Sequence, residues 1–247
     1  NPFDLPVRVL MVISRPDEAG FIDPRSSAEP MLDALDELGD QVIVEFLRPP
    51  TLATLTRRLR DPRLPPVHVV HFDGHGVYDK GIGLGFLLFE DDEHKKDLVD
   101  AERLGSLLNE CGIPLMILDA CQSSTPDDRN PFASVAARLI ESGVGGVVAM
   151  NYSVLVETSK RITKHFYRAL ADGQSVSAAL DVARLELLMD TKRLTLHRGE
   201  HEQTISLQDW FVPVLYQQAS ELIPFTPHPV PHPLTPSPDD EVHRRQE

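Results

Sequence analysis

VHVVHFDGHG at residues 67–76 and LMILDACQSS at residues 115–124 have the same form. Each begins with an apolar run and continues into a turn of small residues that carries one reactive side chain, His75 or Cys121. A short continuous apolar run predicts a strand of a parallel sheet that is covered on both faces. Such sheets place their sites beyond the carboxyl ends of their strands. We therefore expect two neighbouring strands to hold His75 and Cys121 side by side.

This pair of side chains suits nucleophilic catalysis. A cysteine near its reference pKa of about 8.5 is mostly protonated at neutral pH, whereas the thiolate is the nucleophile. A nearby imidazole takes the proton from the thiol and later gives it to the leaving amine. The glycines that flank His75 leave room for a substrate backbone, and a glycine N–H there can face a developing oxyanion.

The two motifs together resemble the caspase-like clan of cysteine proteases, and within it the CHAT branch, the bacterial relatives of separases. Two later segments support the resemblance, GGVVAM at 145–150 and DWFVPVLY at 209–216, so that it covers roughly residues 5–217. It implies an α/β protein, a three-layer α/β/α sandwich around a mainly parallel sheet of about six strands. The alternation of strands and helices along the chain favours the same architecture.

The resemblance also implies roles for individual residues. Cys121 would be the nucleophile, His75 the general base and acid, and the backbone N–H groups of Gly76 and Cys121 the oxyanion hole. Asp119 matches an acidic position that lines the first specificity pocket in metacaspases, paracaspases and separases, which implies cleavage after Arg or Lys. Asp73 would support the histidine turn. The chain departs from the pattern after the nucleophile, where QSS lacks the usual glycine.

Other residues compete for these roles. His71 and His68 are rival bases, although only His75 has the glycine neighbours. Asp119 has the alternative of capping its turn through local N–H groups. Cys111 stands outside any motif and is interpreted as a packing residue. The remaining histidines show no zinc-like spacing, so that we expect neither a metal nor another cofactor.

Three other functions are compatible with the pattern. The first is a catalytically silent caspase-like scaffold or interaction domain. The second is a nucleotide-binding or small-molecule-binding domain. The glycine-rich segment 81–85 could suggest phosphate binding, but it has no Walker lysine and no helix directly after it, which argues against this function. The third is a thiol hydrolase or acyltransferase acting on a substrate other than a peptide, which would not need Asp119.

Composition limits the partners. The chain of 247 residues has 24 basic and 38 acidic residues and a formal net charge of −14, which argues against a broad nucleic-acid surface. No apolar run approaches the roughly 20 residues that span a bilayer. Two cysteines make no disulfide framework, and a nucleophilic thiol favours a reducing compartment. We expect a cytoplasmic protein that acts on protein or peptide substrates.

The remaining elements follow from periodicity and capping signals. Strands are predicted at 7–13, 42–47, 67–72, 115–118, 145–150 and 207–216. Helices are predicted at 27–39, 51–60, 100–109, 131–142, 153–171 and 175–189. A hairpin is expected around 86–89 with a charged tip at 90–96, and 192–204 is expected to be irregular.

The composition changes near residue 221, after which prolines dominate. We expect a protease domain over 1–220 and a semi-rigid linker or tail over 221–247. This tail would lead to a sensor or oligomerising module, as in the larger regulated proteins of defence and cell-death-like responses that the resemblance implies. Because the chain begins with Asn1, we interpret it as an excised domain or a processed chain.

Overall fold

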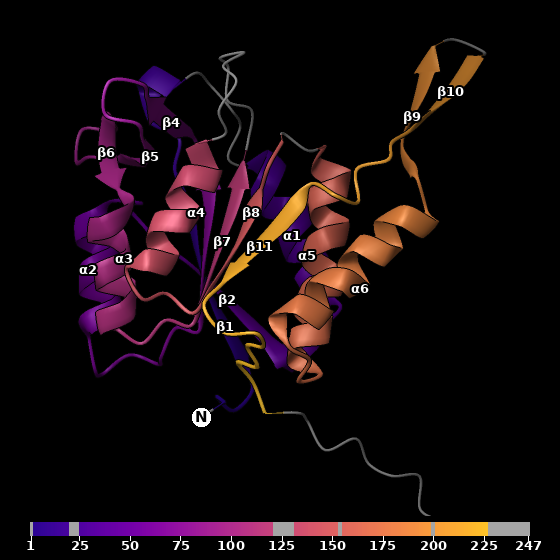
Figure 1. Cartoon of the computed structure of the whole chain (residues 1–247). Coiled ribbons are helices and arrows are strands. Elements are labelled where there is room, and N and C mark those ends of the chain that lie inside the picture. Colours follow the sequence, from indigo (N-terminus) through magenta and orange to yellow (C-terminus); the bar gives the residue numbers. More distant parts are fainter. Residues whose placement is uncertain (1, 20–24, 121–130, 153–154, 199–200, 227–247) are drawn as a thin grey trace, which may run out of the picture.

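The architecture is built on a central sheet of six strands. A computed structural model describes residues 2–19, 25–120, 131–152, 155–198 and 201–226 (Figure 1). The strands lie in the order β11-β8-β7-β3-β1-β2. Their bounds are β1 Val7–Ile13, β2 Val42–Phe46, β3 Val69–Gly74, β7 Leu115–Ala120, β8 Gly146–Met150 and β11 Pro213–Gln217.

Five of these strands are parallel, and only the edge strand β11 runs antiparallel to its neighbour β8. Every residue of β3 and β8 is buried, whereas the edge strands β2 and β11 expose part of their side chains. This difference follows from position, because a central parallel strand is covered on both faces. The predicted α/β class with a mainly parallel sheet of about six strands is confirmed.

Helices cover both faces of the sheet, which makes three layers. Figure 1 shows α1, α5 and α6 on one side and α2, α3 and α4 on the other. Their bounds are α1 Arg25–Asp36, α2 Leu52–Arg60, α3 Ala101–Glu110, α4 Pro131–Glu141, α5 Val156–Ala171 and α6 Val176–Met189. The first residues of three predicted helices, Thr51, Asp100 and Ser175, are N-caps, and each accepts a hydrogen bond from a backbone N–H in the first turn.

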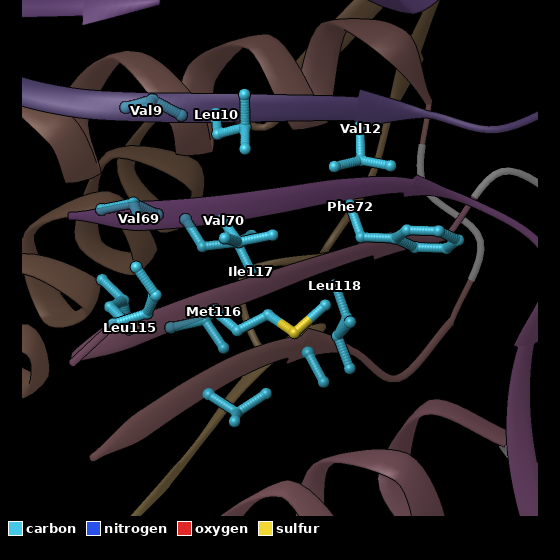
Figure 2. Close-up of a cluster of buried hydrophobic side chains, with 14 of the residues drawn as sticks. Val9, Leu10, Val12, Val69, Val70, Phe72, Leu115, Met116, Ile117 and Leu118 are labelled. Atoms are coloured by element: carbon cyan, nitrogen blue, oxygen red, sulfur yellow. The ribbon is translucent and has the colours of Figure 1, made fainter. Parts of the chain in front are cut away.

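The core lies between the sheet and these helices. Figure 2 shows apolar side chains of β1, β3 and β7 packed in rows, among them Leu10, Val70 and Met116. These three side chains are fully buried. Within the described parts of the chain, no helix is both long enough and apolar enough to cross a bilayer.

A smaller sheet follows β3 directly. It comprises β4 (Gly76–Asp79), β5 (Leu84–Glu90) and β6 (Lys96–Asp100), paired antiparallel in that order. The predicted hairpin is therefore present, with β4 as a third strand. Gly85 packs against the beginning of α4, where an added Cβ would lie 2.5 Å from the carbonyl oxygen of Pro131. This contact fixes the small sheet against α4.

Two predicted segments were wrong in detail. Residues 192–204 are not irregular, because β9 (Lys192–Arg198) and β10 (His201–Ser206) form an antiparallel hairpin that projects from the body of the molecule (Figure 1). The last strand of the main sheet begins at Pro213 and not at Leu207. The hairpin strands are rich in polar residues and form a separate two-stranded sheet. The sequence therefore contains no apolar run that would indicate these strands.

Candidate functional site

The two sequence motifs converge on one edge of the sheet. β3 and β7 are parallel neighbours, and their register pairs Asp73 with Asp119 and Gly74 with Ala120. These positions directly precede His75 and Cys121 in the sequence. The prediction that the two motifs lie on adjacent strands is confirmed. Cys121 itself lies outside the described residues.

His75 occupies a crowded turn between β3 and β4. The residue is 5% exposed, and its carbonyl oxygen accepts a 2.9 Å hydrogen bond from the N–H of Leu88 in β5. A Cβ at Gly74 would lie 2.6 Å from the ring of Phe72, and one at Gly76 would lie 3.0 Å from the Pro131 side chain. Both glycines therefore allow the chain to approach its neighbours closely on either side of the histidine.

Asp73 is held by an arginine that follows β1. Nη2 of Arg15 donates 2.8 Å hydrogen bonds to both carboxylate oxygens of Asp73, and Nη1 donates to the Asp73 carbonyl oxygen at 2.8 Å. The two side chains are only 7% and 2% exposed. The backbone N–H of Ser14 also donates to the Asp73 carbonyl oxygen. Asp73 is thus fixed by an ion pair with Arg15, a partner that the sequence did not predict.

The backbone of Arg15 is fixed from the small sheet. Its N–H donates a 2.8 Å hydrogen bond to Glu90 Oε1, and the other oxygen of Glu90 lies 2.9 Å from Nδ1 of His94. The Glu90 carboxylate raises the pKa of the exposed His94 imidazole. This connection joins the end of β5 to the turn after β1, so that Arg15 is constrained at both its backbone and its side chain.

Asp119 faces α5 and is 7% exposed. One carboxylate oxygen, Oδ2, accepts a short hydrogen bond from the Ser159 hydroxyl and lies 4.0 Å from Nε2 of His71. Burial lowers the pKa of His71 to about 4, an effect that the Asp73 carboxylate partly opposes. The imidazole is therefore neutral at pH 7, and neither of these two neighbours brings a full positive charge to Asp119.

The two rival histidines, His71 and His68, pack against other side chains and have neighbours within hydrogen-bond distance. His71 is buried, and its Nδ1 lies 3.1 Å from the hydroxyl of Tyr167 in α5. His68 lies at the amino end of β3, where its Nδ1 accepts from the Arg8 N–H and its ring stacks on Phe3 at 4.6 Å. The amino end of β3 lies at the opposite edge of the sheet from His75, which follows the carboxyl end of this strand. Neither position suits a base acting on Cys121 at neutral pH.

The buried His71 should make the protein less stable in acid. The unfolded chain binds a proton on this residue near pH 6.5, and the folded chain near pH 4, so that stability falls as pH decreases between these values. The loss should reach roughly 3 kcal/mol below about pH 4. Urea denaturation across this pH range should show a shallower slope for His71→Gln than for the wild type. The control His94→Gln should keep the wild-type loss in acid, since the His94 pKa is raised.

Three residues of this region were missed by sequence reasoning: Arg15, Ser159 and Tyr167. Arg15 carried a usable signal, because it follows a predicted strand at the same edge as Asp73 and Asp119. Ser159 and Tyr167 belong to the face of α5 that packs on the sheet, and helical periodicity marks such positions only as buried. Ser153, which was expected to begin this helix, lies outside the described residues, and α5 begins at Val156 with Leu155 as its N-cap.

The remaining candidates lie apart from this edge or contribute backbone groups. Gly76 is the first residue of β4 and follows His75 directly. Cys111 is the C-cap residue of α3, and burial raises the pKa of its thiol. Among the residues that the structure describes, no group of three or more His, Cys, Asp or Glu side chains is arranged to hold a metal ion.

The chain matches a known family and is similar in fold to solved structures, among them a caspase. The family model described as CHAT domain matches residues 5–218. The crystal structure of the Drosophila initiator caspase Dronc aligns with 87% of this chain and 81% of that chain, at 10% sequence identity and a TM-score of 0.49. No curated protein matches the sequence.

Proposed function

The chain belongs to the CHAT-domain family, and from that premise we propose that it is a cysteine endopeptidase domain with His75 and Cys121 as its catalytic dyad. The observation that carries the proposal is the register of β3 and β7, which pairs Gly74 with Ala120. The next residue after each is a member of the dyad. Adjacent parallel strands lie about 4.8 Å apart, so that residues leaving them at matched positions start within reach of each other.

The proposed reaction uses only groups of the chain and water. His75 takes the proton from the Cys121 thiol, and the thiolate sulfur attacks the carbonyl carbon of the scissile peptide bond. The N–H groups of Gly76 and Cys121 stabilise the oxyanion. The C–N bond breaks as His75 protonates the leaving amine, which leaves a thioester on Cys121. Water, activated by His75, then hydrolyses the thioester and regenerates the thiol.

Asp119 supports a preference for Arg or Lys before the cleaved bond. The other carboxylate paired with it in the strand register, Asp73, is neutralised by Arg15. The Ser159 hydroxyl donates to Asp119 Oδ2, and the neutral imidazole of His71 lies 4.0 Å from the same oxygen. The Arg15 guanidinium, which already binds Asp73 and two carbonyl oxygens, is poorly suited to receive an acidic side chain.

The position of the C-terminal segment supports its proposed role as a tether. We propose a protease domain, predicted at residues 1–220, and a tether, predicted at 221–247, which would join a sensor or oligomerising module in a regulated defence protein. Phe225 is fully buried in the core, so that the packed domain extends beyond the predicted boundary. Phe225 pairs with Phe3 and packs against His68 at the amino edge of the sheet. The described chain therefore ends on the edge of the sheet opposite to His75.

Peptide cleavage tests this function. We expect fluorogenic peptides with Arg or Lys before the leaving group to be cleaved at least about tenfold faster than peptides with Leu or Asp there. Cys121→Ala should abolish cleavage, and Asp119→Asn should reduce the preference for Arg and Lys. A preference for Asp would contradict the pocket assignment. If the full-length protein with its activator cleaves none of the peptides, the chain is a scaffold and not a protease.

A further inference from the structure

The Asp119 carboxylate is held from α5. The Ser159 hydroxyl donates to Asp119 Oδ2 from the first turns of this helix. A hydroxyl donor fixes the rotation of the carboxylate and favours its charged form, because hydrogen bonds to charged groups are stronger than those between neutral groups. Asp119 is therefore oriented by a residue that is 40 positions away in the sequence.

His71 of β3 lies near the same oxygen, at a distance too long for a hydrogen bond. Burial, and after it the nearby Asp119 charge, raise the pKa of the Tyr167 hydroxyl well above its ordinary value, so that this group stays protonated. A Tyr167 O–H that donates to Nδ1 of His71 leaves the imidazole proton on Nε2, which lies 4.0 Å from Asp119 Oδ2. We assign this tautomer because it directs an N–H, and not a lone pair, toward the carboxylate.

The residue before Ser159 anchors the same turn of α5. Thr158 is fully buried and donates a 2.6 Å hydrogen bond to Asp209 Oδ2. Asp209 also binds the Arg193 guanidinium, whose Nη2 lies 2.6 Å from Oδ1. Arg193 in turn donates to the carbonyl oxygen of Leu187 at the end of α6. Two consecutive residues of α5 thus connect Asp119 on one side with the base of the β9–β10 hairpin on the other.

We propose that Ser159 is the positioning residue of Asp119 and so sets the preference for a basic substrate side chain, with Thr158 holding its helical turn in place through Asp209. The proposal rests on the proposed function, since it deepens the role given to Asp119. It differs from that role in assigning selectivity to α5 as well as to the strand that leads to Cys121.

The test measures ligand binding in addition to turnover. The protein is the full chain with Cys121→Ala, and the probes are Nα-acetyl-arginine amide and Nα-acetyl-norleucine amide, titrated by calorimetry. Removing the Ser159 hydroxyl in Ser159→Ala should weaken binding of the arginine probe by about tenfold or more, as expected for a lost hydrogen bond to a charged group. Ser159→Thr, which keeps the hydroxyl, should restore most of this binding. Binding of the norleucine probe should be unchanged.

Two further readouts separate positioning from general structural damage. The pH below which binding of the arginine probe is lost should be higher in Ser159→Ala than in the parent protein. The reason is that the charged carboxylate no longer accepts a hydrogen bond from the hydroxyl. Thr158→Val, which has the same shape without the hydroxyl, should weaken binding of the arginine probe less than Ser159→Ala. The matched control Ser177→Ala, in α6, removes a hydroxyl that pairs with Ser175 and should change neither probe.

The outcomes distinguish this proposal from the proposed function. If the arginine probe fails to bind, or binds equally well to Ser159→Ala, the positioning role is overturned. If the arginine probe binds and Ser159→Ala weakens it, the positioning role stands even where wild-type protein cleaves no peptide, and only the protease assignment fails. An equal loss of both probes would show a collapsed site and would also overturn the proposal.

Discussion

Replacing His75 by alanine should lower the rate at which a peptidyl arginine chloromethyl ketone alkylates Cys121 by about 10²- to 10⁴-fold at neutral pH. In this reaction the thiolate displaces chloride, and His75 is the proposed acceptor of the thiol proton. Without an imidazole beside it, the thiol titrates near its reference pKa of about 8.5 and presents little thiolate. Intact mass and peptide mapping after timed labelling measure the rate and identify the modified cysteine.

Two controls make this result specific. Cys111→Ser removes the other cysteine, whose thiol has a raised pKa, and should leave both the rate and the adduct unchanged. Thermal unfolding of His75→Ala should show that the fold is retained. Equal labelling of Cys121 in the wild type and His75→Ala would show a reactive thiol and no dyad, and a main adduct on Cys111 would contradict the assignment of the nucleophile.

The fold was predictable because its central strands are recognisable in the sequence as short apolar runs. Residues 115–120 and 146–150 are apolar over nearly their whole length, and residues 69–72 are apolar apart from His71, as expected for strands covered on both faces. The order of the strands in the sheet was not predicted, apart from the two motif strands being neighbours. The β9–β10 hairpin escaped prediction for the opposite reason, since its polar residues pair with each other away from the core.

Only the parts of the candidate site that depend on local sequence motifs were predictable. A histidine and a cysteine after apolar strands mark one edge of the sheet, and β3 and β7 are indeed neighbours there. The partners of Asp73 and Asp119 come from distant parts of the chain, Arg15 after β1 and Ser159 in α5. Such contacts depend on how the layers pack, and a single sequence contains no pattern that pairs these residues. The dyad itself stays a prediction until Cys121 is tested.

The second large effect, on the stability of the fold, is expected at the buried ion pair of Arg15 and Asp73. Asp73→Ala should lower the free energy of unfolding by about 3–5 kcal/mol, because it leaves the Arg15 guanidinium buried without its carboxylate. The two side chains are 7% and 2% exposed, so that water cannot easily replace the lost partner. Urea denaturation measures the change. The exposed pair Arg60–Glu110, with side chains 53% and 58% exposed, is the matched control, and Glu110→Ala should cost less than about 1 kcal/mol.

A double variant separates the charge from the packing. Arg15→Met with Asp73→Leu removes both charges while keeping apolar volume, and should recover much of the stability lost in Asp73→Ala, since paired buried charges offset each other's cost of leaving water. The double variant should nevertheless label Cys121 more slowly than the wild type, because Nη1 of Arg15 also binds the carbonyl oxygen of Asp73, two residues before His75. A loss of stability in Asp73→Ala no larger than that in Glu110→Ala would mean that the pair does not hold the histidine turn. Equal labelling of the stable double variant and the wild type would confine the pair to a structural role.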